Sequence, residues 1–114
     1  MKVVKFSPNG NYLLVGYESS TVDIVDTSTY SRVQTLNTGH SKVYDIDFYD
    51  DATLVTCGDD QKFKIWDPTS GWSNQHSSSS HGDVVWQCKF NSNGKVGIGL
   101  SPGTIRIYDS SYSY

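Results

Sequence analysis

The chain has 114 residues, of which 36% are hydrophobic and 18% are charged, and its formal net charge is −3. This composition is typical of one globular domain, and the scattered Lys and Arg residues form no basic patch for nucleic acid or an anionic membrane. The apolar runs are far shorter than the roughly 18 residues of a membrane helix, and the opening MKVVKFSPNG turns polar too early for a signal peptide.

The first 37 residues contain four short runs in which apolar and polar residues alternate as in β-strands. These runs are VVKFSPNG (3–10), YLLVGY (12–17), VDIVD (22–26) and RVQTLN (32–37). The pair Asn9-Gly10 marks a hairpin turn, because both residues tolerate a positive φ. The segment is therefore predicted to form four antiparallel strands.

The same succession of strand-like runs returns twice along the chain. The second series is IDFYDDA (46–52), TLVTCG (53–58), FKIWD (63–67) and a weaker GWSNQH (71–76). The third is CKFNSNG (88–94), KVGIGL (95–100) and IRIYD (105–109). Eleven strands and no helix are predicted. The serine-rich segment from Ser73 to Gly82 has no apolar anchor, so it is expected to be the most mobile internal loop.

Two sets of residues give the period of this repeat. The phenylalanines of the first run in each series lie 42 residues apart: Phe6, Phe48 and Phe90. The aspartates that close the third run lie 41 and 42 residues apart: Asp26, Asp67 and Asp109. Because two independent sets of residues give nearly the same period, the chain is predicted to be built of repeats of about 42 residues.

The second repeat has the most specific residues: Gly39-His40, then VYDIDF, LVTCGDD and KFKIWD ending in Trp66-Asp67. In this succession it resembles a blade of the WD40-repeat β-propeller family. The resemblance covers the whole chain and implies an all-β fold of consecutive four-stranded antiparallel blades. Residues 1–114 would form a partial propeller with repeats at about 1–37, 38–78 and 79–114.

The resemblance also implies a buried hydrogen-bonded tetrad in the second repeat: His40, Thr56, Asp60 and Trp66. The chemistry is sound on its own terms, because a buried carboxylate needs donors and an imidazole N–H can supply one. The Thr56 hydroxyl can in turn meet the imidazole and accept from the Trp66 indole. A structural network is therefore expected, the alternative being a proton relay between His40 and Asp60.

The other two repeats depart from this pattern and are expected to depend on apolar packing. In the third repeat the tetrad positions hold His81, Ile98, Pro102 and Tyr108. In the first repeat Val25 takes the tryptophan position, and whether Glu18 substitutes for the turn aspartate stays open.

The resemblance implies a non-catalytic protein-interaction scaffold that binds a protein or peptide, without nucleic acid or a membrane. In this family the partner often meets the face formed by the Gly-His loops and the turns between the second and third strands. The matching positions are Tyr17, Lys42, Asp59, Val84 and Ser101. The abundant Tyr and Trp residues can pack between blades or anchor a partner on such a face.

A hydrolase that uses Ser101 or His40 is the alternative from another class, because GLSPG (99–103) fits the pattern Gly-x-Ser-x-Gly. That motif needs a helix after the serine, whereas TIRIYD alternates like a strand. The residue after the nucleophile must also donate its backbone N–H to the oxyanion, and Pro102 has none. The stretch is therefore predicted to be a turn between strands, with no catalytic residue.

Cysteine and histidine spacing gives no other site. Cys57 and Cys88 fall within strand patterns and are expected to be small core residues, with reduced thiols, although one disulfide would be compatible with the sequence. An intracellular protein, cytoplasmic or nuclear, is expected. No Cys-x-x-Cys pair, close His spacing or phosphate-binding glycine loop occurs, so neither a metal nor a cofactor is predicted.

Three blades are too few for a ring, because propellers have about four to eight. The chain is therefore expected to be a piece of a longer propeller. The alternatives are a purely structural subunit and a protomer that closes a ring with copies of itself.

Overall fold

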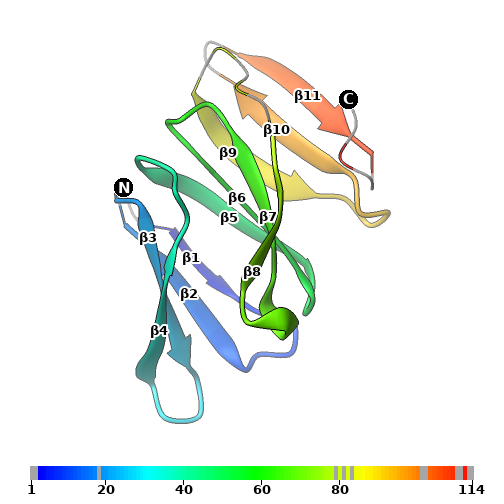
Figure 1. The fold of residues 1–114 in the computed structure, drawn as a ribbon. Helices are drawn as coiled ribbons and strands as arrows, with labels where there is room; N and C mark the ends of the chain where they lie inside the picture. Colours follow the sequence, from blue (N-terminus) through cyan, green and yellow to red (C-terminus); the bar gives the residue numbers. More distant parts are fainter. Residues whose placement is uncertain are drawn as a thin grey trace.

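Three antiparallel sheets follow one another along the chain in a computed structural model, which describes residues 3–17, 19–78, 80, 82, 84–100, 103–109 and 112. The strands lie in chain order within each sheet, so every connection is a simple hairpin (Figure 1). Eleven strands are present in the described ranges, as the sequence predicts. The all-β prediction of consecutive blades in an incomplete ring is confirmed.

The three sheets are named blades 1, 2 and 3. Blade 1 consists of β1 (Val3–Phe6), β2 (Tyr12–Gly16), β3 (Thr21–Asp26) and β4 (Ser31–Asn37). Blade 2 consists of β5 (Val43–Asp50), β6 (Thr53–Gly58), β7 (Phe63–Asp67) and β8 (Ser73–Ser77). Blade 3 consists of β9 (Val85–Phe90), β10 (Val96–Leu100) and β11 (Thr104–Tyr108). The first strand of each blade, β1, β5 or β9, is called its inner strand.

Two hydrophobic cores lie between neighbouring blades. Leu14, Ile24, Ile46 and Leu54 are fully buried between blades 1 and 2. A second core joins blades 2 and 3 and includes both cysteines, which are buried and unpaired as expected. Full burial of an aliphatic side chain contributes about 1.5–3 kcal/mol, so the packing of blade on blade is a main source of stability.

The serine-rich segment agrees with one expectation and corrects another. The weak strand predicted at 71–76 is present as β8, which pairs antiparallel with β7, so the expected loop from Ser73 to Gly82 is wrong over residues 73–77. After β8, Ser78 N donates to the carbonyl of Phe63 (2.9 Å) and Phe63 N donates to Ser78 Oγ (2.9 Å). Hydrogen bonds with β7 therefore order residues 73–78 without apolar alternation.

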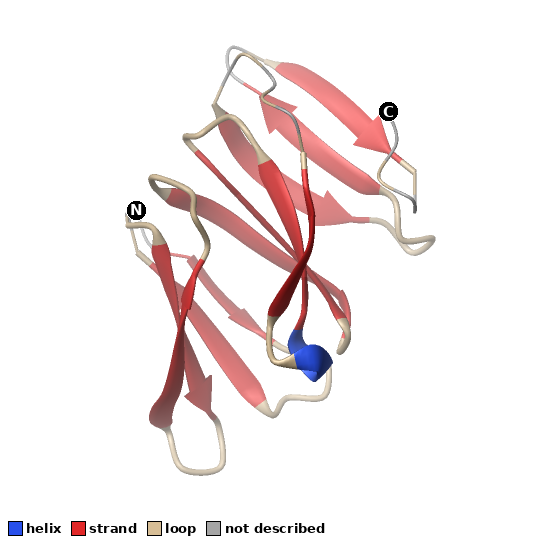
Figure 2. Cartoon of the chain, in the orientation of Figure 1, coloured by secondary structure: helices blue, strands red, loops and turns tan. Residues whose placement is uncertain are grey.

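A short 3-10 turn, Pro68–Ser70, precedes β8 and was not expected (Figure 2). Asp67 begins it, because its carboxylate accepts from Thr69 N (2.9 Å), and Gly71 ends it at a φ of 71°. Within the described ranges, no helix has the length and apolar character needed to cross a membrane.

Candidate functional site

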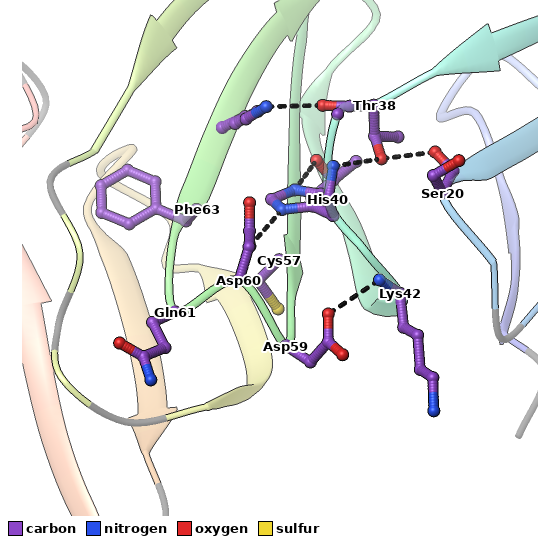
Figure 3. Close-up of polar contacts among 12 residues, drawn as sticks. Ser20, Thr38, His40, Lys42, Cys57, Asp59, Asp60, Gln61 and Phe63 are labelled. Atoms are coloured by element: carbon purple, nitrogen blue, oxygen red, sulfur yellow. Dashed lines mark hydrogen bonds and ion pairs between the residues drawn. The ribbon is translucent and has the colours of Figure 1, made fainter.

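The four tetrad side chains of blade 2 form one chain of hydrogen bonds. His40 Nδ1 lies 2.7 Å from Asp60 Oδ1, and His40 Nε2 lies 2.9 Å from Thr56 Oγ1. The indole N–H of Trp66 donates to the same Thr56 oxygen at 3.0 Å. His40 is only 1% exposed, and it points from the segment before β5 towards the turn after β6 (Figure 3).

The direction of these bonds follows from the two end groups: the Asp60 carboxylate can only accept, and the Trp66 indole can only donate. Thr56 Oγ1 accepts from it and uses its own hydrogen to donate to His40 Nε2. His40 is then neutral and donates from Nδ1 to the Asp60 carboxylate. All four groups are satisfied with one proton on the imidazole, so a second proton on His40 would remove the acceptor of the Thr56 hydroxyl.

The backbone before β5 connects this network to blade 1. His40 N donates to Thr38 Oγ1 (3.2 Å), whose hydroxyl donates to the carbonyl of Ser20 (2.7 Å). Lys64 Nζ donates to the carbonyl of Thr38 at 2.7 Å. The hydrogen bonds therefore fix the chain at the point where it passes from one blade to the next (Figure 3).

Burial lowers the pKa of His40 below its ordinary value of 6.5, although the neighbouring Asp60 opposes the shift. The unfolded chain then binds a proton more readily than the folded one, so stability is fully present above about pH 6.5 and is lost as the pH falls towards the folded pKa. We expect the urea midpoint to fall between about pH 7 and about pH 5, a range above the titration of ordinary carboxylates.

His40→Gln should flatten this pH dependence, because glutamine does not titrate. Urea unfolding of both proteins at the two pH values measures the difference. An equally steep fall in the variant would show that His40 is not the titrating group.

The end of β6 touches the start of β5 beside the tetrad. Lys42 N donates to Asp59 Oδ1 (2.8 Å), and Asp59 N donates to the carbonyl of Lys42 (3.2 Å). Gly58 is buried at this contact, and a Cβ on it would overlap the Lys42 carbonyl and approach His40 Cβ to 3.0 Å. Only glycine lets the two backbones come this close.

Four of the five residues of the expected partner face lie at this same end of the blades. Lys42 lies just before β5 and Val84 just before β9, while Tyr17 follows β2 and Asp59 follows β6. Tyr17 and Lys42 are exposed, and Asp59 and Val84 are half-buried. Ser101, Pro102 and Glu18 lie outside the described residues, and so does His81. The strand after GLSPG is β11, as predicted.

A pair of aromatic residues on the inner strands extends this end of the molecule. Tyr44 of β5 and Trp86 of β9 stack with ring centroids 4.6 Å apart and an interplanar angle of 17°. Trp86 is 42% exposed. A cavity of about 460 Å³ lies beside the stack and is lined by Val3, Tyr44, Asp45, Trp86, Gln87, Gly99 and Leu100.

Sequence reasoning did not single out this pair, although the two residues lie 42 positions apart, which is the repeat period. Two aromatic residues at the same repeat position of neighbouring blades are a signal that could have found them. The pair, the cavity and the Lys42–Asp59 contact are together called the loop end.

At the two tetrad positions of blade 3 that the structure describes, Ile98 and Tyr108, apolar packing replaces the polar network, as expected. Tyr108 takes the place of the tryptophan and packs its ring on Phe63 of blade 2, with centroids 4.8 Å apart and an interplanar angle of 63°. Ile98 takes the place of the threonine and is buried. Described His, Cys, Asp and Glu residues form no group of three or more that could hold a metal ion.

Comparison with known proteins agrees with the blade architecture. The family model for the WD domain, G-beta repeat (WD40), matches residues 30–67. The chain is 32% identical over 117 residues to the nuclear distribution protein nudF of Aspergillus niger, which covers 97% of this chain and 26% of that protein. It is 30% identical over 84 residues to the DDB1- and CUL4-associated factor 10 of Homo sapiens, which covers 73% of this chain and 15% of that protein.

Among solved structures, the β-propeller domain of Myceliophteria thermophila Cps50 (Swd1) aligns with a TM-score of 0.82 and 21% identity, over 96% of this chain and 35% of that one. The chain thus spans about a quarter or less of the length of these curated relatives. The blades, the matched repeat and these relatives together show that the chain belongs to the WD40-repeat β-propeller family.

Proposed function

We propose that this chain is a non-catalytic interaction scaffold whose three blades form part of a larger propeller and whose loop end binds a protein or peptide. The observation that carries the proposal is the stacked Tyr44–Trp86 pair beside its cavity. Half-exposed tryptophan next to a concave, mostly apolar surface is the kind of anchor that dominates binding energy in protein interfaces.

The polar groups around the cavity favour a peptide as the ligand. The Lys42–Asp59 contact presents an exposed cation and a half-buried carboxylate at the same end of the blades. An extended segment could place an apolar side chain against Trp86 and pair its backbone or charged groups with this rim. The relatives whose names describe association with other proteins, such as the DDB1- and CUL4-associated factor, are consistent with a protein ligand.

A structural role for the tetrad supports the absence of catalysis. Both ring nitrogens of His40 are engaged within the blade, and the side chain is almost fully buried. A general base must reach the substrate proton directly or through one water, which this imidazole does not do.

Unpaired thiols at Cys57 and Cys88 also fit a reducing compartment, the cytoplasm or nucleus.

Replacement of Trp86 by alanine tests the proposal. Peptides that bind the immobilised chain are selected from a random phage-displayed library, and their dissociation constants are measured by calorimetry. We expect Trp86→Ala to weaken binding about tenfold or more, because it removes a central aromatic anchor.

Tyr30→Ala is the matched control, because Tyr30 is 82% exposed in the turn between β3 and β4, away from the loop end. This variant should bind like the unmodified chain and keep its melting temperature, whereas Trp86→Ala loses the stack on Tyr44 and should melt a few degrees lower but still cooperatively. Unchanged binding by Trp86→Ala, or selection of no peptide at all, would contradict the loop end as the binding site.

A further inference from the structure

The inner strands carry alternating charges at one position of the repeat. Lys5 of β1, Asp47 of β5 and Lys89 of β9 are spaced by 42 residues, so they occupy equivalent places in blades 1, 2 and 3. Lys5 Nζ lies 3.6 Å from Asp47 Oδ1 across the junction of blades 1 and 2. At the next junction, Lys89 Nζ lies 3.3 Å from Asp45 Oδ2. The two outer blades are thus basic at this position and the middle blade is acidic.

Two carboxylates of blade 2 also accept hydrogen bonds from the backbone of blade 3. Asp45 Oδ2 accepts from Cys88 N (3.2 Å), and Asp47 Oδ2 accepts from Phe90 N (2.8 Å). Two donors of an inner strand are therefore satisfied by two carboxylates of the preceding blade. The repeat equivalents of Cys88 and Phe90 in blade 1 are Val4 and Phe6.

The two outer faces of the chain are apolar in the same way as the buried faces between blades. On blade 3, the face away from blade 2 carries Gln87, Lys89, Gly97, Gly99, Ile105 and Ile107, as the strand register shows. Ile105 is 72% exposed, and a cavity of about 320 Å³ lies over the two glycines. On blade 1, Phe6 is 61% exposed. Each face is suited to pack against a further blade.

A second copy of this chain would bring like charges together at these faces. If blade 3 packed on blade 1 of a copy as blades pack within the chain, Lys89 would meet Lys5 of that copy. The positions of Asp45 and Asp47 are held in blade 3 by Gln87 and Lys89. Each of these two ammonium groups is already paired with a carboxylate of its own blade 2, so the two like charges would face each other with no further carboxylate between them.

We propose that each outer face takes a WD40-type blade other than this chain's own, whose inner strand carries an aspartate or glutamate at the position of Asp47. This inference rests on the proposed function, in that it assumes a larger propeller, and it specifies the chemistry of the neighbouring blades. Such a carboxylate would pair with Lys89 on one side, as Asp47 pairs with Lys5, and would accept the Phe6 N–H on the other.

Charge reversal at Lys5 and at Lys89 tests, within the 114-residue chain itself, whether these faces select a neighbour of opposite charge. In Lys5→Glu and in Lys89→Glu, head-to-tail dimers would bring unlike charges together at both junctions. In the wild type and in Lys5→Glu/Lys89→Glu, they would bring like charges together. We expect both single variants to self-associate about tenfold or more tightly than either like-charged protein, as measured by sedimentation at about 0.05 M salt and weakened at about 0.5 M.

Two controls separate this effect from loss of folding. A mixture of the wild type with the double variant has unlike charges at both junctions and should give a 1:1 complex, although neither protein dimerises alone. Lys89→Gln removes the like charge without adding an opposite one, so its affinity should be intermediate. Each glutamate would also stand beside Asp47 or Asp45 of its own chain, so the melting temperatures are expected to fall; with circular dichroism they report whether each variant is folded.

Wild-type chain that dimerises as tightly as the single variants would overturn the inference in favour of a second copy as the neighbour. Absence of association in every variant and in the mixture would overturn it as well. Neither outcome affects peptide binding at Trp86, so failure of this inference is distinguishable from failure of the proposed function.

Discussion

Replacement of Gly58 by alanine is expected to lower the free energy of unfolding by about 3 kcal/mol, near the upper end for an overpacked site. The new Cβ would overlap the backbone carbonyl of Lys42, which cannot rotate away because Asp59 N donates to it and Val43 pairs with Gly58 across the strands. Relief requires β5 and β6 to move apart at the loop end. Urea unfolding followed by tryptophan fluorescence measures the loss.

Gly97→Ala is the matched control for this variant. Gly97 also lies in the second strand of a blade, but a Cβ on it would approach the Lys89 carbonyl only to 3.9 Å, an ordinary contact. Its stability should change by less than about 0.5 kcal/mol. Equal effects of the two substitutions would show that the close approach of Gly58 and Lys42 is absent in solution.

Replacement of Thr56 by valine is expected to cost about 2–4 kcal/mol, because two buried groups lose their partner at once. The side chain keeps its shape, so no cavity forms, but the Trp66 indole N–H and His40 Nε2 are left without the hydroxyl that joins them. Thr56 is fully buried, which prevents water from replacing that hydroxyl without a rearrangement.

Thr35→Val provides the comparison. The Thr35 hydroxyl donates to Asp23 on an exposed part of blade 1 (3.2 Å), and water can take its place. We expect a change below about 0.5 kcal/mol. If thermal unfolding shows the two valine variants to be equally stable, the tetrad does not stabilise blade 2.

The repeat period predicted most of the fold because equivalent runs return every 41 or 42 residues, whether a strand alternates, as β3 does, or is buried along nearly its whole length, as β6 is. The strand from Thr21 to Asp26, for example, buries Val22 and Ile24 and matches the predicted VDIVD closely. The outer strand β8 was predicted only weakly, as GWSNQH (71–76), because its residues do not alternate between apolar and polar. It is ordered by backbone pairing with β7 and by the bonds between Ser78 and Phe63, neither of which leaves a hydrophobic pattern.

The site was predicted in part. The four tetrad residues are recognisable because each needs a particular polar atom at a particular place, and the structure brings them together. The Tyr44–Trp86 stack forms because β5 and β9 lie side by side, and no local sequence pattern predicts that neighbourhood. Asp45 and Asp47 resemble solvent-facing positions of an alternating strand, yet they bind the backbone of the next blade.

The central claim, that the loop end binds the partner, is tested most directly by nuclear magnetic resonance. The ¹⁵N-labelled chain is titrated with a peptide selected as above, and shifts of backbone and indole signals are mapped on the structure. The account predicts that the largest changes fall on the Trp86 indole and on the amides of Lys42, Tyr44 and Asp59. Changes confined to the outer strands β4 and β8, with the Trp86 indole unmoved, would contradict it.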